Sequence, residues 1–124
     1  VAGALTRESL RCNIGKPAQY VTVHSGMEVE PFLHPPVPRE AVRAQLGLAE
    51  SDIAVGTIAR LFHMKGHDDL IALAPELCRR HPRLKFVWIG DGILRGEFER
   101  RIDAAGLGDR FVFTGLVPPT RIPE

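Results

Sequence analysis

The stretch from Ile53 to Gly66 reads IAVGTIARLFHMKG and decides the fold class. Its first part, Ile53–Ala59, is a continuous apolar run rich in β-branched residues, and a basic loop that ends in glycine follows it. Similar apolar runs return at Phe86–Ile89 and Phe111–Phe113. Continuous rather than alternating apolarity is typical of strands that are covered on both faces, as in a parallel sheet.

Segments with helical periodicity separate these runs. Asp68–Arg80 places apolar side chains on one face, and Pro75 within it is expected to remove one backbone hydrogen bond and kink the helix. Leu94–Ala105 has the same pattern, and Gly106 followed by Leu107 is typical of a Schellman cap. Strands and helices alternate as in successive βαβ units. The sequence therefore predicts an α/β fold, a Rossmann-like open parallel sheet with flanking helices.

The first part of the chain carries weaker signals. Thr6–Cys12 predicts a helix, and Tyr20–Val23 predicts a short strand. Phe32–Pro38 is rich in proline and predicts a loop. Arg39–Leu46 follows a proline and predicts a helix that stops at Gly47.

Length and composition limit the classes of function. The 124 residues are one domain's worth or less, and a net charge of +1 gives no global reason to expect nucleic acid or an anionic membrane as partner. Neither Cys12 nor Cys78 belongs to a CxxC pair, so a reducing cytoplasm fits best. Each of the five histidines is expected at the surface or at a helix cap rather than as a metal ligand.

The first loop at a strand end offers a diphosphate clamp. In open α/β sheets, ligands bind beyond the carboxyl ends of the strands. Arg60 supplies a planar fork and Lys65 a movable point charge, and Gly66 lets a ligand approach the backbone. Asp68 and Asp69 already complement the dipole of the next helix, so side chains rather than the helix end would hold phosphate. A solvated basic loop is the alternative interpretation.

The other two strand ends are less specific. Gly90–Gly92 suggests a dinucleotide loop, but no acidic residue follows Phe111–Phe113 to bind ribose hydroxyls, and a tight turn accounts for the glycines. The third end carries the apolar residues Leu116 and Val117. These residues could pack against a flat base, or they could belong to a plain loop.

Four motifs in order and at the right spacing resemble a known family. The run AVGTIARLFHMKGHDDL from Ala54 resembles the opening of the nucleotide-binding domain of retaining GT-B glycosyltransferases of family 4, the glycosyl transferases group 1. The likeness continues in FVWIGDG from Phe86, in GLGDRFVFTG from Gly106, and upstream in VHSGMEVEPF from Val23. It covers most of the chain, from Tyr20 onward.

The resemblance implies transfer of a sugar from a nucleoside-diphosphate sugar, with UDP or GDP as carrier, to an acceptor hydroxyl with retention. Arg60 and Lys65 would be the catalytic pair that neutralises charge on the leaving diphosphate, with Gly66 beside them. The remaining implied donor-binding residues line the strand ends or border the nucleobase: Gly90, Asp91, Gly92, Leu116 and Val117. The resemblance implies that no metal is bound. It also implies no cofactor, because the nucleotide sugar is a substrate.

The resemblance also implies a partial domain. Residues 1–124 would form the first part of the C-terminal donor-binding domain, with residues 1–19 as an interdomain segment, and the isolated chain is expected to be inactive. The acceptor, a sugar or a lipid-linked molecule, would bind to a separate domain. We expect no nucleic acid partner and a cytoplasmic location, with peripheral membrane association of a longer parent protein left open.

Two alternatives remain at this point. One is a sugar-nucleotide epimerase on the same scaffold. The other is a non-catalytic nucleotide-binding or interaction module, since an unpaired sheet edge and exposed apolar surface favour self-association.

Overall fold

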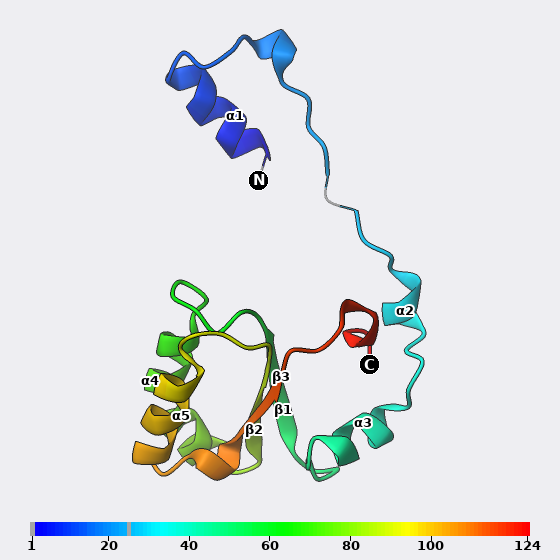
Figure 1. The fold of residues 1–124 in the computed structure, drawn as a ribbon, viewed down its shortest axis with the longest axis vertical. Coiled ribbons are helices and arrows are strands. Elements are labelled where there is room, and N and C mark those ends of the chain that lie inside the picture. The colour runs from blue at the N-terminus through cyan, green and yellow to red at the C-terminus, as the bar shows by residue number, and fades with distance from the viewer. Residues whose placement is uncertain (1, 25) are drawn as a thin grey trace. The chain divides into compact units, whose positions relative to one another are not determined.

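A computed structural model describes residues 2–24 and 26–124 of the chain. The chain divides into two compact units, Val1–Glu30 and Pro31–Glu124. The first unit contains α1 (Ala2–Arg11) and a short 3-10 helix, η1 (Pro17–Gln19). Both are blue in Figure 1. The candidate site described below lies entirely within the second unit.

The second unit is built on a three-stranded parallel sheet. Its strands are β1 (Ile53–Ile58), β2 (Leu84–Ile89) and β3 (Phe111–Gly115), in the order β1-β2-β3. β2 begins before its predicted start and β3 extends beyond its predicted end. The predicted open parallel sheet is confirmed.

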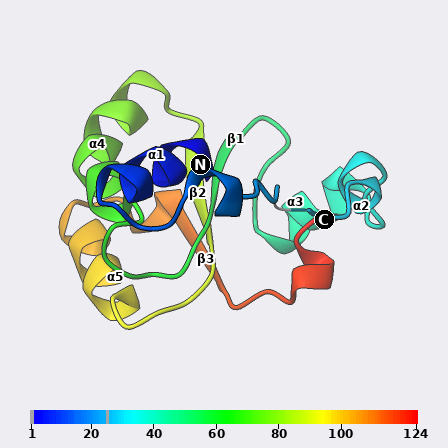
Figure 2. The ribbon, with the colours of Figure 1, turned by 90° about the horizontal axis from the view of Figure 1, so that it is seen from above.

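Two crossover helices cover one face of this sheet. They are α4 (His67–Arg80), which leads from β1 to β2, and α5 (Arg95–Ala104), which leads from β2 to β3. Both lie on the same side in the two views of Figures 1 and 2, while α3 (Arg39–Gln45) lies on the other side. The strands follow each other in one direction across the sheet, and crossovers of one hand then place successive helices on one face.

The core lies between the sheet and these two helices. Trp88 of β2 is fully buried and meets Phe98 of α5 edge to face, with ring centroids 5.6 Å apart. Phe86 and Phe111 stack on neighbouring strands at 4.6 Å. Burial of each such side chain contributes about 1.5–3 kcal/mol, so the aromatic cluster holds β2 as the central strand.

The predicted Schellman cap of α5 is confirmed. Gly106 has φ +69°, its N–H donates to the carbonyl of Asp103 at 2.9 Å, and the N–H of Leu107 donates to the carbonyl of Ile102 at 3.0 Å. Glycine adopts this left-handed conformation without a Cβ penalty. Gly47, with φ +67°, ends α3 in the same way.

The prediction that all three strands are covered on both faces is wrong for β1. Ile53, Val55 and Ile58 are 47%, 37% and 60% exposed. β1 is an outer strand that pairs with β2 alone, and among the described residues α4 packs on β2 rather than on β1. Its apolar side chains therefore lie at the surface of this unit.

The prediction of a strand at Tyr20–Val23 is also wrong. The backbone there has no regular secondary structure, and Val21 and Val23 are more than four-fifths exposed. A strand needs a neighbour that satisfies its N–H and C=O groups, and residues 2–24 and 26–30 of this unit supply none.

Two boundaries in the first part of the chain differ from the sequence predictions, and the predicted end of the Pro75 helix at Arg80 is confirmed. The first helix begins at Ala2, ahead of the predicted Thr6. Within the predicted loop Phe32–Pro38, the first two residues belong to the short helix α2 (Glu30–Leu33). Pro75 lies inside α4, which continues through it to Arg80.

Candidate nucleotide-diphosphate site

Backbone hydrogen bonds join the three loops at the carboxyl ends of the strands. The N–H of Leu61, after β1, donates to the carbonyl of Asp91, after β2, at 3.0 Å. The N–H of Gly90 donates to the carbonyl of Gly115 at the end of β3, at 2.9 Å. The loops therefore form one connected edge, as expected where parallel strands end together.

Gly90 and Gly92 allow this close approach of two loops. A Cβ atom at Gly90 would lie 2.2 Å from the carbonyl oxygen of Ala59, and one at Gly92 would lie 2.2 Å from that of Leu61. Gly90 also has φ +141°. The glycines are thus required by packing between two backbones, a reason beyond the tight turn that the sequence suggested.

A hollow of about 230 Å³ opens at this edge. Five of the predicted site residues contribute to its lining: Arg60, Gly90, Asp91, Leu116 and Val117. The other three, Lys65, Gly66 and Gly92, lie outside this lining. The structure therefore gathers residues from all three strand ends around one depression.

Apolar residues that the sequence prediction missed form part of the hollow. Ile58 and Ile89 end β1 and β2, and Ile122 lies beyond the third loop. The signal for the first two was present, because the last residues of parallel strands meet at one edge. Ile122 follows a turn whose path the sequence does not give.

A second hollow, of about 410 Å³, lies on the α3 side of the sheet. It is bordered by Val42 of α3, by Leu46 directly after α3 and by Val112 of β3, and it shares Leu116 and Val117 with the first. Arg60 does not border it, and Arg121, which does, is paired with Glu124 at 2.6 Å. The smaller hollow is therefore the better candidate for an anionic ligand.

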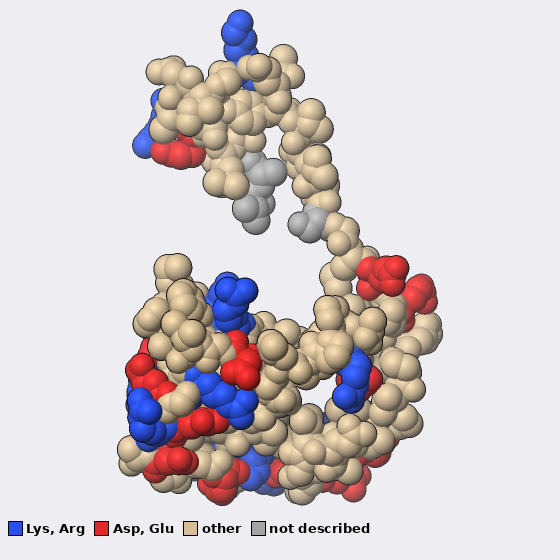
Figure 3. Space-filling view, viewed as in Figure 1, with Lys and Arg blue, Asp and Glu red and all other residues tan. Residues whose placement is uncertain are grey.

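The side chains of Arg60 and Lys65 are uncommitted. Both residues are exposed, and neither side chain makes an ion pair or a hydrogen bond within residues 2–24 and 26–124. By contrast, Arg101 pairs with Asp68 at 2.5 Å. Figure 3 shows positive and negative side chains interspersed over α4 and α5. The two loop cations are thus free to bind an anion, while many helix cations are already neutralised.

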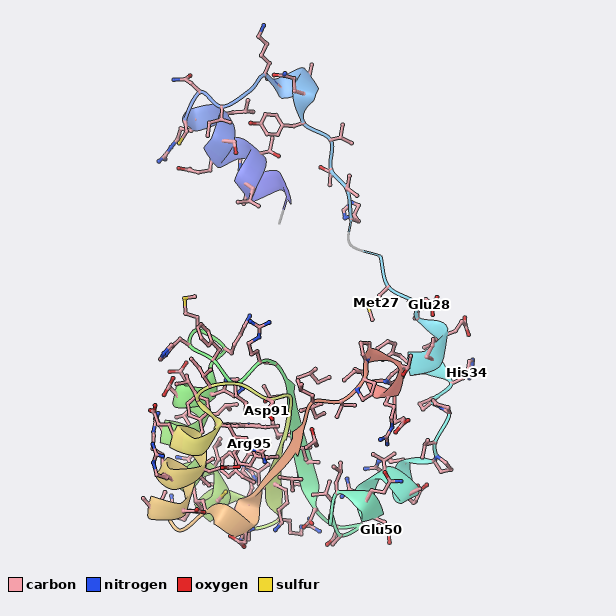
Figure 4. All side chains as sticks on the ribbon, in the orientation of Figure 1. Met27, Glu28, His34, Glu50, Asp91 and Arg95 are labelled. Atoms are coloured by element: carbon pink, nitrogen blue, oxygen red, sulfur yellow. The ribbon has the colours of Figure 1, made fainter. Side chains whose placement is uncertain are left out.

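The carboxylate of Asp91 contacts two residues that follow it closely in sequence. One carboxylate oxygen accepts from the N–H of Gly92 at 2.7 Å, and the other lies 3.5 Å from the guanidinium of Arg95 (Figure 4). Arg95 also donates to Glu99 at 2.8 Å. Glu99, and less strongly Asp91, raise the pKa of Arg95. The charge of Asp91 is partly offset by Arg95, which lessens repulsion of a phosphate in the hollow.

Arg95 was not among the predicted site residues. Its guanidinium lies 5.6 Å from the centroid of the Phe113 ring and thus reaches β3 from α5. The sequence carried no clear signal for this pair, because Asp91 lies in the loop before α5 and Arg95 is the first residue of the helix.

The N-terminus of α4 is unfavourable for phosphate binding. Gly66 is the N-cap, with φ +79°, and Asp68 and Asp69 occupy the first turn as predicted. The hydrogen bond from Arg101 lowers the pKa of Asp68. The helix end is already complemented by carboxylates, so a phosphate near this loop depends on side chains.

His67 is buried, contrary to the expectation that each histidine lies at the surface or caps a helix. It is 1% exposed, and its ring lies 4.6 Å from Trp88 and 5.3 Å from Phe98, centroid to centroid. The overlooked signal is periodic, because His67 shares a helix face with the buried residues Ile71 and Ala74. Among the described residues, no three His, Cys, Asp or Glu side chains lie together as potential metal ligands.

Comparison with known proteins identifies the family. Residues 38–124 match the family model described as "Glycosyl transferases group 1". The chain belongs to this family. A similar protein is the 2-deoxystreptamine N-acetyl-D-glucosaminyltransferase of Streptomyces fradiae, 37% identical over 78% of this chain and 23% of its own length. Another is a GDP-mannose-dependent mannosyltransferase acting on phosphatidylinositol monomannoside in Mycolicibacterium smegmatis, 29% identical over 95% of this chain and 31% of its own length.

Two solved structures share the fold. Anabaena HepE in complex with UDP superposes on 97% of this chain and 33% of its own, with a TM-score of 0.76 and 22% identity. The C-terminal domain of a group 1 glycosyl transferase, LpcC from Francisella tularensis, covers 79% of this chain and 52% of its own, with a TM-score of 0.62 and 23% identity. The predicted relation to the C-terminal domain of a group 1 glycosyltransferase with the GT-B fold is confirmed.

Two further properties concern the length of the chain and the presence of membrane-spanning helices. It spans less than a third of the length of the two curated relatives described above. No helix in the described ranges has both the length and the apolarity that crossing a bilayer requires.

Proposed function

We propose that this chain supplies part of the donor site of a nucleotide-sugar-dependent glycosyltransferase. The observation that carries the proposal is the uncommitted Arg60 at a hollow bordered by Leu116 and Val117, at the joined carboxyl ends of three parallel strands. A charge beside an apolar wall suits a nucleoside diphosphate, which has an anionic and a flat apolar part. UDP bound to Anabaena HepE supports this ligand class.

Arg60 and Lys65 would act on the leaving group. When the bond between the sugar and the diphosphate breaks, negative charge develops on the phosphate oxygens. Two preplaced cations stabilise that charge, and they do so more in the transition state than in the ground state. Gly66, Gly90, Asp91 and Gly92 would shape the edge around the diphosphate, and Leu116 and Val117 would border the base.

The full reaction would need more than this chain. In this proposal, residues 1–124 form part of the donor-binding domain, with residues 1–19 leading into it, and the acceptor site lies elsewhere in the parent protein. Transfer to a sugar or lipid-linked hydroxyl with retention belongs to that complete enzyme. The names of the two curated relatives described above, of which this chain spans less than a third, give 2-deoxystreptamine and phosphatidylinositol monomannoside as acceptors.

Calorimetric titration tests the proposal. UDP and GDP are titrated into the chain, with AMP and NAD as controls. We expect a nucleoside diphosphate to bind and Arg60→Ala to abolish or strongly weaken the binding. Tight binding of NAD alone would contradict the proposal, because it would indicate a dinucleotide site.

A specific observation favours a second candidate for the isolated chain, self-association. β1 is an outer strand with an unpaired edge in the described part, and Ile53, Val55 and Ile58 are exposed on it. Such edges pair readily with other strands. Light scattering that shows oligomers, together with calorimetry that shows no nucleotide binding, would favour an interaction module over a donor half-site.

A further inference from the structure

The basic loop is fastened at both ends by buried side chains. Leu61 is fully buried, His67 is 1% exposed, and the five residues between them, Phe62–Gly66, are exposed. Met64, at the tip, is 95% exposed and has φ +63°, a conformation that costs energy for a residue with a Cβ. The loop that carries Lys65 therefore depends on its two anchors for its shape.

The anchor at Leu61 does not titrate. Its side chain is aliphatic, its N–H donates to Asp91 at 3.0 Å, and its carbonyl accepts from the N–H of Leu94 at 3.3 Å. Arg60 directly precedes this anchor. The position of Arg60 is thus tied to the backbone of the second loop, and a change of pH near neutrality leaves that tie intact.

The anchor at His67 is of a different kind. Its ring packs between Trp88 and Phe98, and neither ring nitrogen has a hydrogen-bond partner in the described part of the chain. The indole of Trp88 is itself a buried donor without a partner. A protonated imidazole would add a positive charge and a second N–H donor to this cage, which costs more than burial of the neutral ring.

Several charged or polar groups face this anchor. On α4, Asp68 favours the charged imidazole, but its carboxylate is bonded to Arg101 of α5, which lies 5.9 Å from the Phe98 ring. The loop contributes the Phe62 backbone, which also favours the charged form, and His63, whose charge acts on Asp68. β2 contributes only the neutral Trp88. Burial outweighs the Asp68 and Phe62 effects and lowers the pKa of His67.

We propose that His67 is a positioning residue for the diphosphate clamp: the neutral ring, wedged between Trp88 and Phe98, holds the Lys65 end of the loop, and protonation releases that end while the Arg60 end stays fixed. The inference rests on the proposed role of Lys65 in binding diphosphate. The loss of affinity in acid would then act through Lys65 alone.

The first experiment monitors protonation of His67 in the absence of nucleotide. The chain has one tryptophan, and it touches His67, so Trp88 fluorescence and the His67 ring signals in NMR both report protonation of this ring. Between about pH 7.5 and about pH 4.5, a range that extends below ordinary histidine titration because burial lowers the pKa of His67, we expect the amide signals of Met64 and Lys65 to shift with the same midpoint as the His67 ring. His67 titration without movement of these amides would overturn the proposal.

The second experiment measures binding. UDP-glucose is the probe, because both of its phosphates are esterified and do not titrate near pH 6, unlike a terminal phosphate. In the wild-type chain we expect affinity to fall about fivefold or more from pH 7.5 to about pH 4.5, the scale of one lost charge-assisted contact. His67→Phe keeps the ring but cannot titrate, so its affinity should be nearly independent of pH.

Two further variants distinguish loss of the Lys65 contact from titration of the other histidine in the loop. Lys65→Ala should bind weakly at both pH values with no pH dependence, whereas His63→Gln should keep the wild-type pH dependence, since His63 lies in the same exposed loop without a buried anchor. The proposal is overturned if His67→Phe retains the pH dependence. Failure of UDP-glucose to bind at either pH would refute the proposed function instead, and the NMR titration would still decide whether His67 holds the loop.

Discussion

The backbone of Gly92 lies directly against that of Leu61: a Cβ atom at Gly92 would stand 2.2 Å from the Leu61 carbonyl oxygen. That carbonyl also accepts the N–H of Leu94. The contact joins the loop after β2 to the loop that carries Arg60, so it determines where the clamp lies relative to the rest of the sheet edge.

Gly92→Ala should destabilise the fold. No side-chain rearrangement relieves a clash between a Cβ and a backbone oxygen, so we expect the free energy of unfolding to fall by about 1–3 kcal/mol. Urea denaturation followed by Trp88 fluorescence measures it. Gly96→Ala is the matched control, because its Cβ would meet only the tip of Arg100 at 4.0 Å inside α5. Alanine there should stabilise the helix by about 0.5–1 kcal/mol. Equal effects of the two substitutions would contradict the packing argument.

Gly106→Ala should also destabilise, for a different reason. Nothing lies within 4 Å of a Cβ at this position, but φ is +69°. The cost is therefore conformational alone, about 1–2 kcal/mol. Gly106→Asn should cost less than Gly106→Ala, because asparagine tolerates the left-handed region. Thermal unfolding compares the two, and an alanine variant as stable as wild type would show that the Schellman cap contributes little.

Arg60→Ala and Lys65→Ala should each weaken binding of a nucleoside diphosphate by about 1–3 kcal/mol in the intact enzyme, since each removes a charge-assisted contact. Arg83→Ala is the control, because Arg83 is an exposed cation that precedes β2 at the opposite edge of the sheet. Calorimetry at fixed ionic strength gives the three affinities. Unchanged affinity in both loop variants would remove the clamp hypothesis, and an equal loss with Arg83→Ala would indicate only a general charge effect.

The Asp68–Arg101 pair should be visible in the titration of the carboxyl group. The hydrogen bond from Arg101 lowers the pKa of Asp68 below its ordinary value. Because the folded-state pKa is the lower one, the contribution to stability is present above the ordinary pKa and is lost as pH falls through the folded value. NMR titration should show the pKa of Asp68 rising toward normal in Arg101→Gln. A pKa that does not move would mean that the pair does not persist in solution.

Much of the fold could be predicted because it depends on local patterns. The apolar runs at Ile53, Phe86 and Phe111 specify three strands between amphipathic helices, and Gly106 with Leu107 specifies how α5 ends. These features follow from periodicity and from the conformational freedom of glycine. The strand at Tyr20–Val23 failed as a prediction because apolar residues form a strand only where another strand is available to pair with them.

The candidate site was predictable in its residue types but not in its arrangement. The sequence by itself determined that Arg60 and Lys65 follow a strand and that glycines follow the next one. Only the tertiary structure decided that Gly92 packs on Leu61, that Arg95 offsets Asp91, and that His67 enters an aromatic cage. Each of these contacts joins residues whose meeting depends on how the loops and helices pack. Local propensity acts over a few residues, whereas such contacts are set by which surfaces exclude water together.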